Sequence, residues 1–175
     1  QNSTMPQAQK SVCPQCRQKF PTSDEEAVKQ VREWVDKGKP WAETSLAHQY
    51  KSGAGVPQSY EEAIEYNNMA IKQGDPNAMY GLATMYYQGQ GVAQSVEKAA
   101  ELYAMAANQG HAHAQFNLGV FYEDGKGVAQ SYEKAFDLYT LAANQGDADA
   151  QFNLGTTHIH GHGVAQSNDM ARKWW

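Results

Sequence analysis

Small and apolar residues recur along this chain in a fixed register. The glycines that mark the register are spaced 36 residues apart, with no insertion or deletion, at Gly38, Gly74, Gly110 and Gly146. A constant period of this length is typical of a solenoid, in which one supersecondary unit is repeated and stacked. The chain is therefore expected to be an array of similar units, each packed on its neighbours.

Each unit has the pattern of two helices joined by a loop. In the second unit the first helix is predicted over residues 75–88, with Ala78, Leu82 and Tyr86 on one face at the spacing i, i+4, i+8. The second helix is predicted over residues 95–109. Its inward residues are Ala99, Leu102, Tyr103 and Ala106. Gly110 is expected to end it as a left-handed residue.

The loop between the two helices carries two glycines in every unit, at positions 53/55, 89/91, 125/127 and 161/163. Their recurrence predicts a left-handed backbone or a close approach between helices. A second small-residue column lies within the first helices and contains Ala47, Ala83, Gly119 and Gly155. Small residues there would let neighbouring helices pack closely.

A serine precedes each second helix, and the same column begins before the first full unit. Ser23 and Glu26 fit a capping box, in which side chains bind free backbone groups at a helix start. We therefore expect residues 23–37 to be the second helix of a half unit. Full units follow from positions 38, 74 and 110, and a shortened one covers 146–175. Residues 1–22 are predicted to be a flexible segment.

One unit shows the repeated pattern most clearly. Its characteristic residues are Ala114, Leu118, Gly119, Tyr122, Gly125, Gly127, Val128, Ser131, Lys134 and Ala135. This pattern resembles the Sel1-like repeat, a relative of the tetratricopeptide repeat. The resemblance implies an all-α fold, a right-handed α/α superhelix whose first helices line the concave face. It also implies an interaction scaffold or adaptor, a subunit or assembly factor of a larger complex, and not an enzyme.

The resemblance assigns a set of columns to the concave face, and these become the predicted partner-binding residues. They are Asn77, Tyr80, Thr84, Tyr87, His113, Phe116, Asn117, Val120, Glu123, Asp124, Asp149, Phe152, Asn153 and Thr156. Asn117 and Asn153 would hold a partner's backbone, and the aromatic residues would supply contact area. Phe116 and Phe152 have an equally weighted alternative, which is packing between repeats. Trp174 and Trp175 form a second candidate surface at the last helix.

Composition narrows the classes of partner. The net charge is −5, with no basic stripe for nucleic acid, and no apolar run is long enough to span a membrane. No nucleophile–base arrangement stands out from the repeat, so a small-molecule substrate is not favoured. We expect no cofactor and favour an intracellular location. The chain begins at Gln1 rather than Met, which predicts a processed protein or a fragment.

Cys13-Pro-Gln-Cys16 is the stretch with the clearest chemical pattern, a C-x-x-C pair that can present two thiolates to one metal ion. Two thiolates fill half of a tetrahedral zinc shell. The run from Cys13 to Pro21 resembles the closing segment of a RING-type zinc finger, whose other ligands would precede Gln1. A free or disulfide-bonded pair and a complete site within this chain remain alternatives. The resemblance suggests an alternative function, the substrate-binding part of a ubiquitin ligase. A secreted bacterial-type regulator is a third.

Three histidines near the end also invite a metal interpretation. His158, His160 and His162 fall in columns that hold tyrosine, glutamine, aspartate or lysine in other units. Because two of these columns are ordinary solvent-facing positions, a structural role is favoured over a metal site.

Overall fold

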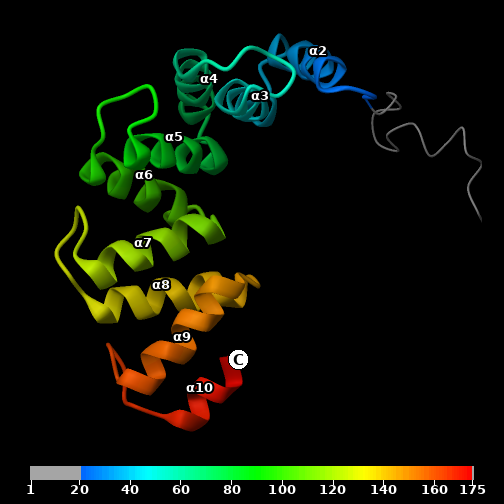
Figure 1. The fold of residues 1–175 in the computed structure, drawn as a ribbon. Coiled ribbons are helices and arrows are strands. Elements are labelled where there is room, and N and C mark those ends of the chain that lie inside the picture. Colours follow the sequence, from blue (N-terminus) through cyan, green and yellow to red (C-terminus); the bar gives the residue numbers. More distant parts are fainter. Residues whose placement is uncertain (1–20, 175) are drawn as a thin grey trace, which may run out of the picture.

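The computed structural model describes residues 21–174, and this part of the chain is a curved stack of helices without strands (Figure 1). Residues 1–20 and 175 lie outside the described part, and with them Cys13, Cys16 and Trp175. The first helices of the units are α3 (Pro40–Ser52), α5 (Pro76–Gln88), α7 (Ala112–Asp124) and α9 (Ala148–His160). The second helices are α2 (Asp24–Val35), α4 (Tyr60–Lys72), α6 (Val96–Asn108), α8 (Tyr132–Asn144) and α10 (Asn168–Trp174).

Helix starts follow from side-chain caps, as the serine column predicts. Ser23, Ser59, Ser95 and Ser131 each accept a hydrogen bond from the backbone N–H three residues later. This satisfies one of the backbone donors that a helix start leaves unpaired. At Ser23 the hydroxyl accepts from the backbone N–H of Glu26, and the carboxylate of Glu26 accepts from the backbone N–H of Thr22.

The core is built from alanine and a few large side chains. Ala78, Ala99 and Ala106 are fully buried, and Tyr103, Leu118 and Phe121 fill the space between them. Small residues let the helix axes approach closely, and the large groups then interdigitate at the density of a protein interior. The predicted inward faces are confirmed, with Leu102 and Tyr86 partly buried at their edges.

The loop glycines serve both purposes that their recurrence predicts. Gly89 ends α5 in the left-handed region at φ 70°, where a glycine is unstrained. Gly91 has a φ of 71°, and a Cβ there would lie 2.4 Å from the Cβ of Tyr60 in the preceding unit. The loop of one unit therefore presses on the second helix of the unit before it, which fixes the stacking.

Candidate functional site

The first helices of three successive units share one hollow, which we call the α3–α5 hollow. It has a volume of about 520 Å³. The residues that line it are Thr44, Ala47, His48 and Lys51 of α3, Asn67 of α4, Asn77, Tyr80, Gly81, Thr84 and Gln88 of α5, and His111 and His113 beside α7. The predicted partner residues Asn77, Tyr80, Thr84 and His113 thus lie together.

Lys51 places a positive charge at the wall of the hollow. Its ammonium donates a hydrogen bond of 3.0 Å to the Thr84 hydroxyl, which donates in turn to the carbonyl of Gly81. Among residues 21–174, Lys51 makes no ion pair with a carboxylate. Burial lowers the pKa of Lys51, because a low-dielectric surrounding disfavours the charged form. A polar partner atom at this wall would restore part of the lost solvation.

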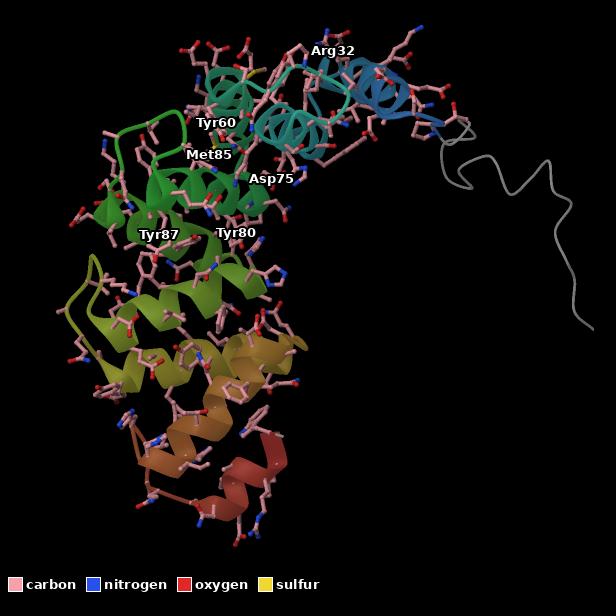
Figure 2. All side chains as sticks on the ribbon, in the orientation of Figure 1. Arg32, Tyr60, Asp75, Tyr80, Met85 and Tyr87 are labelled. Carbon is pink, nitrogen blue, oxygen red and sulfur yellow. The ribbon has the colours of Figure 1, made fainter. Side chains whose placement is uncertain are left out.

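Two histidines and a tyrosine form another part of the wall of the hollow. The rings of Tyr80 and His111 are stacked, with centroids 4.7 Å apart. His111 also caps α7, since its Nδ1 accepts a hydrogen bond from the N–H of Ala114. His113 Nδ1 lies 2.9 Å from the buried carboxylate of Asp147, in the next unit. These contacts hold the wall to two neighbouring units, and Figure 2 shows Tyr80 on the α5 side that faces α7.

Further along the stack, the equivalent space is filled by side chains of the chain itself. The Tyr139 ring lies 5.9 Å from the Phe116 ring, centroid to centroid. Its hydroxyl donates to Glu123. Burial first, and then the bond to Glu123, raise the pKa of Tyr139. Phe116 therefore packs within the stack, in line with its structural alternative.

The remaining predicted residues differ in exposure and in the contacts that they make. Tyr87 is half-buried against Phe121, 5.4 Å between ring centroids, and contributes to packing between repeats (Figure 2). Asn117 and Val120 are partly buried, Asp149 is exposed, and Phe152 is 61% exposed. Asp124 pairs with Lys126 at 2.8 Å. Thr156 donates to the carbonyl of Phe152 in its own helix. Trp174 packs beside the cluster around Tyr139.

Thr44, His48, Lys51 and Asn67 line the hollow but are not among the residues that the sequence predicts to bind a partner. The repeat register marks two of them as departures from their columns. Thr44 stands in the column of Tyr80 and Phe116, and Asn67 in the column of Tyr103 and Tyr139. Both departures occur in the first full unit, in which the sequence predicts no partner-binding residue.

Metal chemistry has no assembled site in the described part of the chain. No group of three or more histidine, cysteine, aspartate or glutamate side chains is arranged to hold an ion within residues 21–174. His158 is buried edge-on to Phe136, and His162 stacks on Tyr132. The zinc-finger interpretation of Cys13 and Cys16 concerns residues outside the described range and stays a prediction.

Comparison with known families decides the classification. The Sel1 repeat model matches residues 42–75, 76–111, 112–147 and 148–175, which together cover most of the chain. The chain belongs to the Sel1 repeat family. The predicted all-α solenoid is therefore confirmed, and Sel1 repeats are in general protein-interaction scaffolds.

Solved structures show the same fold. A Sel1 repeat protein from Oxalobacter formigenes is 36% identical with a TM-score of 0.82, over 89% of this chain and 45% of that one. A protective antigen of uropathogenic Escherichia coli displaying an SLR fold is 28% identical with a TM-score of 0.81, over 89% and 33%. This Sel1 repeat chain thus spans less than half of either relative. Helicobacter pylori cysteine rich protein B, at 21% identity and a TM-score of 0.61, shares the fold over 74% of this chain and 96% of its own. No curated protein matches.

Within residues 21–174, no helix combines the length and apolar character that crossing a bilayer requires.

Proposed function

We propose that this Sel1 repeat chain is a non-enzymatic scaffold that holds an extended or helical segment of a partner protein along its inner surface. The inner surface consists of the α3–α5 hollow together with exposed and half-exposed side chains of α7 and α9. On α7 these side chains begin at Asn117, and on α9 they end at Phe152. The observation that carries the proposal is that three successive units contribute side chains to a single hollow. Curved stacks of repeats present such continuous grooves to their partners.

The charge along the inner surface supports a protein segment as the occupant. Lys51 lies at the α3–α5 end, whereas Glu123, Asp124 and Asp149 lie on α7 and α9. A segment with basic residues toward α9 and hydrogen-bonding groups toward α3 would match both ends. Nucleic acid is a poor fit, because its phosphates would meet the carboxylates of α7 and α9. The partner is proposed to be a subunit of a larger complex.

Selection from a displayed library of random peptides tests the proposal directly. Gln88 lines the hollow as the last residue of α5, and Asn108 is the exposed last residue of α6. Replacing either by arginine adds the same charge at the same kind of helix end. Gln88→Arg should weaken the selected peptides by roughly tenfold or more, whereas Asn108→Arg should leave them unchanged. Equal effects of the two variants, or no effect of either, would contradict binding on the inner surface.

A further inference from the structure

The α3–α5 hollow exists because one pair of aromatic residues is missing from the first full unit. In the second unit the rings of Tyr80 and Tyr103 lie 5.7 Å apart, and in the third unit Phe116 and Tyr139 lie 5.9 Å apart. The same two columns hold Thr44 and Asn67 in the first unit, and both residues line the hollow. The space that a tyrosine of the second helix fills elsewhere is open here.

The surroundings of this space correspond to those of Tyr139. Tyr139 is flanked by Gly119 and directs its hydroxyl to Glu123. The equivalent columns hold Ala47 and Lys51 in the first unit, and both line the hollow. Lys51 therefore stands where a phenolic hydroxyl would end, and its ammonium donates only to Thr84 among the described residues. An ammonium pairs well with a phenol oxygen, which accepts a hydrogen bond.

We propose that the hollow receives a tyrosine side chain from the bound segment of a partner protein, with the ring between Thr44 and Asn67 and the hydroxyl on Lys51. The inserted ring would take the place that Tyr103 and Tyr139 occupy in the following units. Tyrosine suits such a pocket because it combines a large apolar body with a polar end. The stacked rings of Tyr80 and His111 at the same hollow add aromatic surface to its wall.

This inference rests on the proposed function and is tested first with a small probe. N-acetyl-tyrosinamide is titrated into the full chain, and the backbone amide signals of Ala47 and Thr84 are followed by NMR. We expect saturable shifts with a dissociation constant on the order of 1 mM, as befits a ligand of this size. N-acetyl-phenylalaninamide should bind roughly tenfold more weakly, because it offers no acceptor to Lys51.

Asn67→Tyr fills the hollow from within and has a matched control. The new ring would occupy the same columns as Tyr103 and Tyr139, so the variant should keep or raise the thermal midpoint and abolish the probe-induced shifts. Asn68→Tyr places a tyrosine at the exposed neighbouring position of α4 and should leave binding unchanged. If Asn67→Tyr does not fold, Thr44→Phe closes the same space from α3, where other units carry Tyr80 or Phe116.

Lys51→Met tests the role of the ammonium independently of Asn67→Tyr, the variant that fills the hollow. It retains most of the side-chain volume and removes the donor. The tyrosine probe should then bind about as weakly as the phenylalanine probe, whose own affinity should not change. Equal loss for both probes would show that Lys51 acts through packing and would overturn the assigned hydroxyl contact.

Two results would overturn the tyrosine site as a whole. One is that N-acetyl-glutamine or N-acetyl-glutamate shifts Ala47 and Thr84 at lower concentration than the tyrosine probe. The other is that library peptides lose affinity in Gln88→Arg and keep it in Asn67→Tyr. That second outcome leaves the proposed scaffold function standing, whereas peptides insensitive to both variants would contradict the scaffold function itself.

Discussion

The hydroxyl of Tyr139 donates a hydrogen bond of 2.5 Å to the carboxylate of Glu123, joining α8 to the end of α7. In the first full unit the same two columns hold Asn67 and Lys51, which do not meet in this way but line the α3–α5 hollow. One pair of positions therefore closes the inner surface in one unit and opens it in another. We therefore expect substitutions in the closed unit to change mainly the stability of the chain, and substitutions at the hollow to change mainly its binding properties.

The Tyr139 hydroxyl should make stability fall in alkali. Burial and the bond to Glu123 raise the pKa of Tyr139 above its ordinary value of 10.0. The folded state then holds a proton that the unfolded state releases, so this contribution is complete below pH 10 and is lost as pH rises further. Tyr139→Phe should cost about 1 kcal/mol at neutral pH and lessen the alkaline loss. Urea unfolding at pH 7 to 11 measures both effects, and an unchanged alkaline slope would contradict the assignment.

Gly119 and Leu118 should both be intolerant of change, for opposite reasons. A Cβ on Gly119 would lie 2.6 Å from the Tyr139 ring, so Gly119→Leu should destabilise by about 1–3 kcal/mol through overpacking. Leu118 is 5% exposed, and Leu118→Ala should cost about 2–5 kcal/mol through a cavity. Asn117→Ala, on the inner surface, should be near neutral by comparison. If the denaturant midpoints rank Asn117→Ala as the most destabilising of the three variants, the helix face assigned to the interior is wrong.

The His111 cap should weaken in mild acid. Burial, and then the neighbouring His113, lower the pKa of His111 below its ordinary value of 6.5. A lowered pKa gives stability that is present above pH 6.5 and is lost as pH falls through the folded-state value. Protonation would also block Nδ1, the acceptor for the N–H of Ala114.

His111→Asp is the matched variant, because Asp75 and Asp147 cap α5 and α9 in the same column. This variant should keep the cap, and its thermal midpoint should fall less between pH 7 and pH 5 than that of the natural chain. A variant with the same acid sensitivity as the natural chain would show that other groups cause it.

Zinc binding by this chain should be weak. Cys13 and Cys16 supply two thiolates, and a tight structural site needs four ligands. The purified chain should release its zinc to a mild chelator, and Cys13→Ser should change little. Stoichiometric zinc that resists the chelator and disappears in Cys13→Ser would indicate ligands from histidines or a second molecule.

The repeat register, the helix pairs and their ends were determined by the sequence alone. A serine such as Ser95 caps its helix through a neighbour three residues away, and Gly89 ends a helix through its own backbone. These interactions are local, so they can be predicted from the residue and its near neighbours in the sequence. The columns of Ala99 and Tyr103 likewise marked the buried faces, because each unit packs on a nearly identical neighbour.

The tertiary structure decided which inner-surface residues are occupied and where the surface is hollow. Glu123 looks like a free carboxylate of the groove in the sequence, yet it accepts a hydrogen bond from the hydroxyl of Tyr139 in the next helix. Thr44 and Asn67 look like ordinary polar positions, yet together they open a space lined from α3 to α7. Such features depend on side chains from two or three units meeting across the stack, and a hollow is the volume that none of them fills.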